Sequence, residues 1–490
     1  MLDGNLEKNI LEDKIKGLSN QEIGIKYNVN LKFIEKSIVR NLGINVSNPI
    51  NIAPNTGSTK IIKKLSPKDF NLEQNTVWSF KSRGTWATHN GNYRGNWSPY
   101  IPRNIILRYS KEQDLVLDYF CGSGTTAVEA KLLNRNFIGI DINENAIKLA
   151  QENINFNFLF KTAIGTTKSL EFSEISVDLK IGDARDLHFI NDNSIDLICS
   201  HPPYANIVQY THNNNDDLSN YEVNDFINEI EKVAAESYRI LRDGKYCSIL
   251  IGDMRKNKNV IPLGFWTIEK YLKAGFILKE LIIKRQHNCK TTGFWYTNSI
   301  KYNFLLLAHE YLAVFEKPKN NTLKNISSEK TNLLLYNEIN KIEFIKNDNI
   351  QQESTTVWIS DKENWLNNTL NNLIKRYSKN NYSIYNNNYN RKKRSDLLIY
   401  FYDKNFNDFN NNFDNYLEKE GIIAIICGDN RLDNNTIYSI PIHIEKYFNK
   451  NEKLKIKEIV VIQIKDLNNP TKENRNFNIN HKYIMIYKLA

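Results

Sequence analysis

Apolar runs alternate with helical segments over residues 114–317, and this alternation constrains the fold more than any other feature of the sequence. DLVLDYF at 114–120 precedes a helical segment at 125–133, and NFIGIDI at 136–142 precedes another at 144–154. Strands interleaved with helices predict a doubly wound parallel sheet. We expect the last two of the remaining runs to form an antiparallel edge pair. Those runs are SIDLICS, YCSILIG, FILKELIIK and NFLLLAHEYLAVFEK.

The C-terminal part of the chain repeats the earlier part in the same order. Four collinear matches indicate a degenerate repeat, and their changing offsets imply that the second copy has lost the equivalent of about residues 112–180. The matched segments are 76–78 with 356–358, 104–111 with 372–379, 195–198 with 395–401, and 249–272 with 425–448.

Length and composition agree with several domains. A chain of 490 residues with 41% apolar residues can form about three domains with sizeable cores. The polar, Pro- and Asn-containing stretch 47–70 and the Lys/Asn-rich stretch 318–354 read as linkers. We therefore expect an N-terminal arm at 1–46, a sheet domain at 71–317 and a second, degenerate copy at 355–490.

The N-terminal arm predicts a helix-turn-helix. Residues 6–43 read as three short helices, with Asn28 in a tight turn and the last helix at about 31–41. An ordinary helical hairpin would give the same pattern. A net charge of +10 fits a polyanionic partner such as DNA. The residues expected to face it on the last helix are Lys32, Lys36 and Arg40.

Several classes of protein are disfavoured. The five cysteines are widely spaced without Cys/His clusters, so we expect neither a metal site nor a disulfide framework. No signal peptide or long apolar stretch is present, so we expect a cytoplasmic location and no membrane contact.

A glycine-containing turn follows the first predicted strand. In LDYFCGSGTTAVEA, Gly122 and Gly124 let the backbone turn sharply and approach a ligand closely. The next strand ends at Asp141, whose carboxylate can accept both hydroxyls of a ribose, and the third ends near Asp183, which could accept from an adenine amino group. An isolated acid in such a place is often only a helix cap. The third glycine of a dinucleotide fingerprint is missing, which disfavours an NAD enzyme.

The fourth strand ends in SHPPY at 200–204. With the FxGxG turn, this resembles the amino-methylating DNA methyltransferases, which move a methyl group from S-adenosyl-L-methionine to adenine N6 or cytosine N4. The resemblance covers about residues 76–317 and implies a Rossmann-like methyltransferase sheet. His201 is a departure, because the family has Asp, Asn or Ser there.

The catalytic residues that the resemblance implies surround this motif. An exocyclic amine attacks poorly because its lone pair is delocalised into the ring. An acceptor at His201 or Ser200, with a carbonyl of the stiff Pro-Pro chain, could bind both N–H groups. Tyr204 would stack on a base rotated out of the duplex. The alternative is a histidine in a purely structural turn. The residues concerned are Ser200, His201, Pro202, Pro203 and Tyr204.

The resemblance also implies a cofactor site. The segment 78–110 is similar to a family element that packs over the methionine end of the cofactor. The expected cofactor-binding residues are Trp97, Pro99, Asp118, Phe120, Cys121, Gly122, Gly124, Thr125, Asp141, Asp183 and Ala184.

A mixture of cations and aromatic residues follows at 284–303. It suits a DNA-facing loop carrying Lys284, Arg285 and Lys290, although a solvated hairpin would look the same. The next strand carries His309-Glu310-Tyr311, for which we expect a structural part.

Together these features predict an S-adenosylmethionine-dependent DNA methyltransferase that acts on double-stranded DNA. It would work either beside a cognate restriction endonuclease or without one. The second copy lacks both the GxG turn and the PPY motif, so methylation should come from the first copy, and the pair would imitate a dimer within one chain. The alternatives are an RNA methyltransferase of the tRNA guanine-N2 type and a non-catalytic DNA-binding regulator with a methylase fold.

Overall fold

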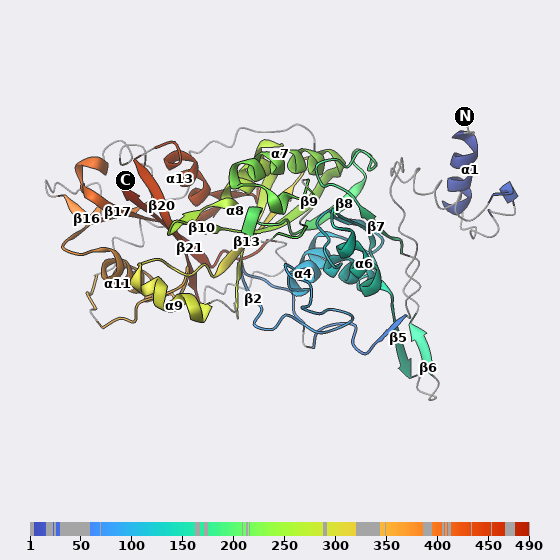
Figure 1. Ribbon diagram of the computed structural model, residues 1–490, viewed down its shortest axis with the longest axis horizontal. Coiled ribbons are helices and arrows are strands. Elements are labelled where there is room, and N and C mark those ends of the chain that lie inside the picture. Colours follow the sequence, from blue (N-terminus) through green and yellow to red (C-terminus); the bar gives the residue numbers. More distant parts are fainter. Residues whose placement is uncertain are drawn as a thin grey trace.

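The protein is seen here in a computed structural model (Figure 1). The described residues are 4–15, 23, 26–29, 59–68, 70–161, 167–170, 175–207, 209–211, 214, 216–287, 292–319, 344–347, 349–385, 394–403, 406, 409, 413–432, 434–451, 453–465 and 476–489. The last helix of the predicted helix-turn-helix lies outside them.

The first half of the chain forms an eight-stranded sheet. Its strand order is β2-β12-β13-β9-β8-β3-β4-β7, and all neighbours are parallel except at β13, which runs antiparallel to both β12 and β9. The strands are β2 (Val77–Ser79), β3 (Leu115–Asp118), β4 (Asn136–Asp141), β7 (Val177–Ile181), β8 (Ile195–Ser200), β9 (Leu241–Gly252), β12 (Ile277–Arg285) and β13 (His309–Glu316).

Helices cover both faces of this sheet, so the doubly wound α/β fold expected from the alternating pattern is correct. Successive residues of a strand point to opposite faces. Leu117 accordingly joins the core beneath α7 and α8, whereas Val116 joins the core beneath α4 and α5. α6 packs beside α5. The helices are α4 (Tyr100–Tyr109), α5 (Thr125–Leu132), α6 (Glu144–Ile154), α7 (Val223–Ile240) and α8 (Leu263–Lys273), with α9 (Thr292–Lys301) between β12 and β13.

The second half forms a six-stranded sheet with the order β14-β20-β21-β17-β16-β15. This is the order of the first sheet from β2 to β3, and every neighbouring pair has the same direction as its counterpart. α11 packs on one face and α13 on the other, as α4 and α8 do in the first half. The elements are β14 (Val357–Ser360), α11 (Trp365–Tyr377), β15 (Tyr382–Tyr385), β16 (Ser395–Phe401), β17 (Leu417–Cys427), α13 (Ile440–Phe448), β20 (Leu454–Ile464) and β21 (His481–Leu489).

Two sequence expectations need correction. The segment missing from the second half begins later than residue 112, because β15 takes the place of β3 although its four residues form no apolar run. What is absent from the six-stranded sheet is the counterpart of β4 and β7. The β12–β13 pair is antiparallel but does not form the edge of the first sheet, since β2 pairs with β12 on its outer side.

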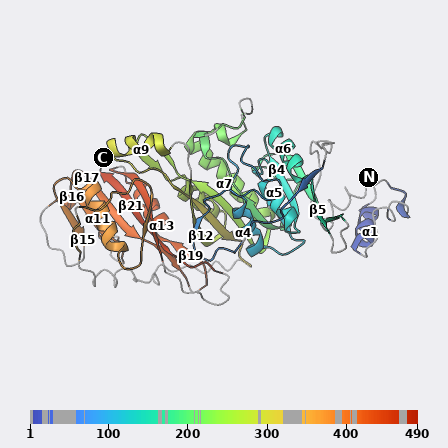
Figure 2. The same ribbon diagram turned by 90° about the horizontal axis from the view of Figure 1, so that it is seen from below.

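The two halves lie side by side along the long axis of the molecule (Figures 1 and 2). They share one apolar core and exchange equivalent contacts. Arg255, on the hairpin of β10 (Met254–Lys256) and β11 (Asn259–Ile261), donates to Glu458 of β20 at 2.5 Å. Arg431, on the equivalent hairpin of β18 (Asp429–Arg431) and β19 (Ile437–Ser439), donates to Glu280 of β12 at 2.5 Å. The same pair of contacts made in both directions describes an approximate two-fold axis between the halves.

A second pair of reciprocal contacts joins the sheets. His309 lies 2.8 Å from the hydroxyl of Thr356 in the other half, and His481 lies 2.7 Å from the hydroxyl of Thr76. Each of these histidines begins the antiparallel strand of its own sheet. The halves are therefore joined through main sheet strands, not only through a linker.

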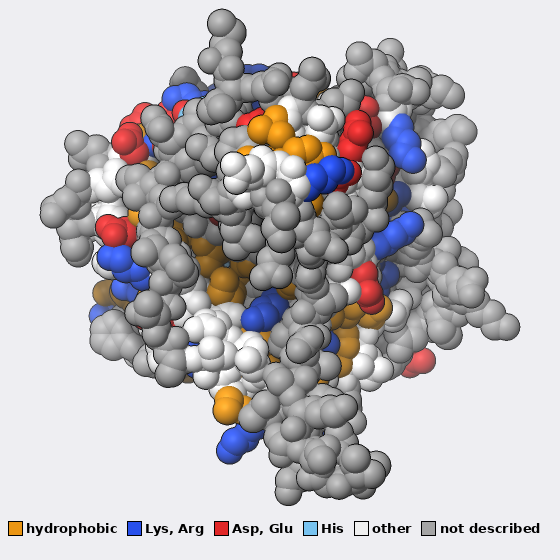
Figure 3. All heavy atoms as spheres, turned by 90° about the vertical axis from the view of Figure 1, so that its right-hand side faces the viewer, with side chains coloured by type: hydrophobic (Ala, Val, Ile, Leu, Met, Phe, Trp, Pro, Cys, Tyr) orange, Lys and Arg blue, Asp and Glu red, His pale blue; other side chains and the backbone are white. Residues whose placement is uncertain are grey.

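A small sheet projects from the first half, at the lower right of Figure 1. It consists of β1 (Lys60–Ile62), β5 (Phe156–Lys161) and β6 (Thr167–Leu170). The helix α1 (Gly4–Ile15) carries Ile10, which packs on Ile23. On the end of the molecule seen in Figure 3, the coloured cationic and acidic side chains are interspersed. None of the described helices is long and apolar enough to cross a membrane.

Candidate functional site

The turn after β3 has the geometry expected of its glycines. Gly122 and Gly124 have φ of +50° and +83°, a region that other L-residues rarely occupy. A Cβ on Gly124 would lie 2.9 Å from the Cβ of Ala150 on α6, so the close approach of α5 to α6 also requires glycine here. The turn leads directly into the N-terminus of α5.

Asp141 ends β4 and braces this turn. Its carboxylate accepts hydrogen bonds from the backbone N–H of Gly122 at 2.8 Å and of Asn143 at 2.9 Å. Burial raises the pKa of Asp141 to about 6, although the two hydrogen bonds oppose that shift. Each oxygen keeps a free lone pair, so the carboxylate can also accept from a ligand hydroxyl.

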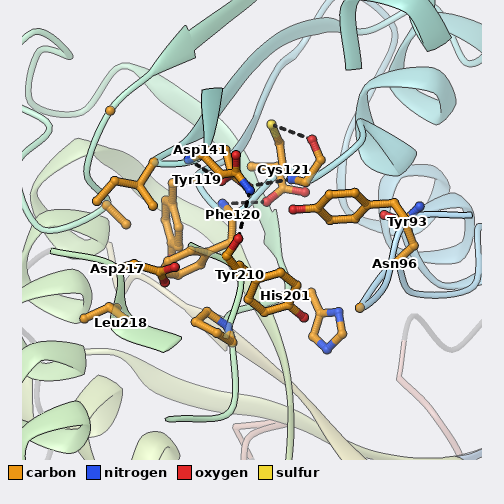
Figure 4. Close-up of a pocket in the computed structure, with 18 of the residues that line it drawn as sticks. Tyr93, Asn96, Tyr119, Phe120, Cys121, Asp141, His201, Tyr210, Asp217 and Leu218 are labelled. Atoms are coloured by element: carbon orange, nitrogen blue, oxygen red, sulfur yellow. Dashed lines mark hydrogen bonds between the residues drawn. The ribbon is translucent and has the colours of Figure 1, made fainter. Parts of the chain in front are cut away.

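A first cavity opens at this edge of the sheet, with about 740 Å³ of empty volume (Figure 4). The ends of β3, β4 and β7 line it, as expected, and Tyr93, Tyr210 and Leu218 close it from other segments. Of the predicted cofactor residues, those that line the cavity are Trp97, Asp118, Phe120, Cys121, Gly122, Thr125, Asp141, Asp183 and Ala184.

The donors and acceptors around this cavity fit a nucleoside with a short charged tail. The glycine turn lets a ligand approach the backbone closely, and the N-terminus of α5 supplies N–H groups. Acidic side chains lie at two strand ends. Asp183 is held by the Arg185 guanidinium, whose Nε lies 3.0 and 2.9 Å from its two oxygens. Pro99 and Gly124 do not line the cavity; Pro99 is the N-cap residue of α4 and Gly124 that of α5.

Ser200 has a structural environment. It is fully buried at the end of β8, and its hydroxyl donates to Asp118 at 2.5 Å. Asp118 also accepts from the hydroxyl of Thr126 at 2.5 Å, and burial raises its pKa to about 6. Two residues were considered as acceptors for the target amine. Ser200 does not line this cavity or the one that adjoins it, whereas His201 lines both.

A second cavity, with about 1130 Å³ of empty volume, adjoins the first. The residues that line both cavities, and so mark where the two adjoin, are Gly95, Asn96, Trp97, His201, Pro203 and Tyr210. The indole of Trp97 stacks on the imidazole of His201, with ring centroids 5.6 Å apart and planes 16° from parallel. The motif at 201–204 therefore stands where the two cavities meet, with Pro202 and Tyr204 facing the second.

Polar side chains form a connected network in the second cavity. The hydroxyl of Tyr204 lies 2.9 Å from Nε2 of His201 and donates to Glu310 at 2.7 Å. Lys284 donates to the other oxygen of Glu310 at 2.6 Å. Burial lowers the pKa of His201 to about 4, so its imidazole is neutral near pH 7 and can accept one hydrogen bond.

Cations line the same cavity. They are Lys81, Arg83, Lys284 and Arg285, with His287 beside them. Arg285 reaches across to the second half, where its Nη1 lies 3.2 Å from Oε1 of Gln463. Lys32, Lys36, Arg40 and Lys290 lie outside the described residues.

Three residues that line the two cavities were not among the predicted site residues. Tyr93 and Tyr210 face each other over the first cavity, with ring centroids 6.2 Å apart, and neither stands in a motif that would have marked it. Glu310, on the strand for which only a structural part was expected, also lines the second cavity. Its signal was present in the sequence as a carboxylate inside an otherwise apolar strand.

Aromatic side chains pack together among the described residues at the end of β16. Tyr400 stacks on Phe409 with centroids 3.9 Å apart, and its hydroxyl donates to Asp403. Phe406 and Tyr385 pack against the same group. Aromatic side chains thus occupy the position that the PPY motif has in the first half.

Comparison with known proteins agrees with this geometry. The family described as DNA methylase matches residues 26–152 and 195–396. The chain belongs to this family. A methyltransferase domain family also matches residues 110–260, which contain the glycine turn and the PPY motif. Membership confirms the methyltransferase fold and S-adenosyl-L-methionine as the cofactor expected from the sequence.

Several type II methyltransferases are similar to parts of the chain. M2.LlaDCHI of Lactococcus lactis subsp. cremoris is 41% identical over 93 residues, which are 18% of this chain and 34% of that protein. M2.DpnII of Streptococcus pneumoniae is 49% identical over 55 residues, which are 11% of this chain and 20% of that protein. M.BglI of Bacillus subtilis is 38% identical over 80 residues, which are 16% of this chain and 23% of that protein. The chain thus matches about a third or less of the length of these relatives.

Proposed function

We propose that the protein is a site-specific DNA methyltransferase that moves a methyl group from S-adenosyl-L-methionine to the exocyclic amine of a flipped adenine (N6) or cytosine (N4). One observation carries the proposal: two cavities, one suited to a nucleoside cofactor and one to a base, adjoin at a shared lining that includes Trp97, His201 and Pro203. A methyl donor in the first cavity and an acceptor amine in the second would meet where the two cavities adjoin, close enough to react.

The first cavity would hold the cofactor. Asp141 accepts hydroxyl groups of a ribose, Asp183 faces the base of the nucleoside, and the turn at Gly122 allows close backbone contact. When bound, the cofactor supplies an electrophilic methyl group on a sulfonium, whose sulfur leaves as a neutral thioether. No metal is needed for such a transfer.

The second cavity would hold the target base. Because Tyr204 gives its hydroxyl proton to Glu310, Nε2 of the neutral His201 imidazole donates to Tyr204, and Nδ1 is left to accept one N–H of the amine. A backbone carbonyl of the Pro202-Pro203 segment can accept the other. Two acceptors would draw the nitrogen toward a pyramidal geometry and free its lone pair. They are preorganised because the Pro-Pro chain is stiff. The ring of Tyr204 offers a stacking surface for the base.

Residues around and beyond the two cavities would add further contacts to DNA. The cations at the second cavity other than Lys284, which pairs with Glu310, would bind phosphates on either side of the flipped nucleotide. We propose that the arm at 1–46, with Lys32, Lys36 and Arg40, adds contacts to duplex DNA, and that 71–317 is the catalytic domain and 355–490 a degenerate copy within one pseudo-dimeric chain. A role in the cytoplasm beside a cognate restriction endonuclease would fit the type II relatives.

The test combines two measurements. Purified protein is incubated with labelled S-adenosyl-L-methionine and with plasmid DNA or bulk tRNA, and DNA from cells expressing the protein is read by long-read sequencing. We expect label in DNA only, at one sequence motif and on one type of base. Label in tRNA would support the RNA methyltransferase alternative. Cofactor-independent DNA binding without transfer would support the regulator.

A further inference from the structure

We propose that Glu310, paired with Lys284, is a positioning residue that holds the hydroxyl of Tyr204 in the target-base cavity. The proposal rests on the function proposed above and adds a residue to it. Glu310 lies on β13, for whose His309-Glu310-Tyr311 segment the sequence predicts only a structural part.

The contacts place Glu310 behind the catalytic motif. One carboxylate oxygen accepts from the hydroxyl of Tyr204 at 2.7 Å, and the other accepts from Lys284 at 2.6 Å. The side chain of Glu310 is 9% exposed and that of Lys284 is 19% exposed, so the pair is largely shielded from water. A shielded, charge-assisted hydrogen bond is stronger and more directional than a solvated one.

The pair also limits how Tyr204 can move. The hydroxyl of Tyr204 is held between Glu310 and the imidazole of His201. The Cβ of a residue at Gly252 would lie 3.0 Å from Cε2 of Tyr204, so β9 packs directly against the ring. Glu310 thus sets the orientation of a ring that the base must stack on, and steadies the imidazole that faces the amine.

The second half of the chain provides an internal comparison. The β12–β13 register pairs Lys284 with Glu310 and Arg285 with His309. The β20–β21 register pairs Ile462 with Lys482 and Gln463 with His481. The equivalents of Lys284 and Glu310 are therefore Ile462 and Lys482, and the ion pair is absent from the half that lacks the PPY motif.

The neighbouring residues of the same strands are retained in both halves. His309 lies 2.9 Å from the hydroxyl of Tyr311, which donates to Asp253 at 3.0 Å. The equivalent distances for His481, Tyr483 and Asp429 are 2.9 and 3.1 Å.

The His–Tyr–Asp contacts occur in both halves, including the half that lacks the PPY motif, so we assign them to the fold that the halves share. The Glu310–Lys284 pair is kept only beside the PPY motif, although β21 forms the same antiparallel pairs without it. Its role is therefore tied to the motif and not to the strand.

A double-mutant cycle tests the assignment. Wild type, Glu310→Ala, Tyr204→Phe and the double variant are compared for kcat and KM of methyl transfer to DNA, and for cofactor affinity. Tyr204→Phe keeps the ring and removes the hydroxyl. We expect Glu310→Ala to lower kcat about 10- to 100-fold, since small displacements at a reacting centre have effects of that order, with cofactor affinity unchanged. In the Tyr204→Phe background the same substitution should lower kcat by less than about threefold, because the contact it acts through is gone.

Two controls separate positioning from folding. Glu310→Gln keeps the shape and one acceptor for Tyr204, so it should recover part of the lost kcat. Lys482→Ala alters the equivalent position of the second half and should leave kcat unchanged. Effects of Glu310→Ala and Tyr204→Phe that simply multiply, or an unchanged kcat for Glu310→Ala, would overturn the assignment while leaving the proposed function intact. Wild-type protein that transfers no methyl group to DNA would instead refute the proposed function, and the assignment with it.

Discussion

Oγ1 of Thr76 lies 2.7 Å from Nδ1 of His481, although 405 residues separate the two in the sequence. Thr356 and His309 make the reciprocal contact at 2.8 Å. Both threonines are buried, and each belongs to the half opposite to its histidine. The two contacts therefore report directly on how the halves are joined.

Thr76→Val and Thr356→Val should destabilise the protein to a similar extent. Each leaves a buried histidine nitrogen without its partner, which costs about 1–3 kcal/mol in the free energy of unfolding. Chemical denaturation followed by circular dichroism measures this. Thr59→Val, at an exposed position, should change the value by less than about 0.5 kcal/mol. A loss confined to one of the two buried variants would contradict the symmetric join.

Arg255→Met and Arg431→Met should both be more damaging. Removing either guanidinium leaves Glu458 or Glu280 buried without its cation, at a cost of about 3–5 kcal/mol. Combining Arg255→Met with Glu458→Leu should recover most of the stability, because no charge is then buried alone. If the double variant is no more stable than the single one, the uncompensated charge is not the cause.

The cost of Arg255→Met should also depend on pH. Burial already raises the pKa of Glu458, and the attraction of Arg255 opposes that shift, so the variant raises the pKa further. A carboxyl whose pKa is higher in the folded than in the unfolded state destabilises increasingly as pH rises from the unfolded value toward the folded one. Relative to wild type, the variant should therefore be less destabilised at pH 5 than at pH 8. An equal difference at both values would argue against titration of Glu458.

Cofactor affinity should rise with pH through about 6. Burial raises the pKa of Asp141 and of Asp118 to about 6, and the ionised carboxylates are the better acceptors for ligand hydroxyl and amino groups. Protonation at lower pH removes that capacity. Isothermal titration of S-adenosyl-L-methionine between pH 5 and 8 measures the effect. Asp141→Asn should bind weakly and keep only the pH dependence that belongs to Asp118.

Tyr204→Ala and Asp141→Ala should abolish methyl transfer by different routes. Tyr204 lines only the second cavity, so its variant should keep cofactor affinity and lose transfer to DNA by about 100-fold. Asp141 lines only the first cavity, so its variant should lose cofactor binding. A Tyr204→Ala variant as active as wild type would show that the catalytic motif has been misassigned.

Arg285→Gln should weaken DNA binding in a salt-dependent way. If Arg285 neutralises one phosphate, the slope of log affinity against log salt should fall in magnitude by about 0.9. Arg242→Gln, which alters a residue paired with Asp196 at the other end of β8, should leave the slope unchanged. Equal slopes for wild type and Arg285→Gln would remove Arg285 from the DNA interface.

The parts of the molecule that local patterns govern were predictable. Apolar runs between helical segments predicted the sheet, and glycines with acids at strand ends predicted one face of the first cavity, because these signals act over a few residues. The projecting sheet was missed, since β1 and β5 pair across almost a hundred residues of sequence. The contact between Glu310 and Tyr204 could not be predicted for the same reason: the two lie 106 residues apart, and only the antiparallel insertion of β13 brings them together.

Arg285 and Gln463 occupy equivalent positions in the two halves and face each other near the approximate two-fold axis. In an assembly of identical subunits, any substitution near such an axis appears twice, so an arginine would confront its own copy and the like charges would repel. Joining the halves in one polypeptide removes that constraint, and a neutral amide can evolve opposite the cation without altering the cation itself. Covalent linkage thus lets one half specialise in chemistry while the other adapts to support it, a division of labour that a symmetric assembly of identical subunits cannot reach by mutation alone.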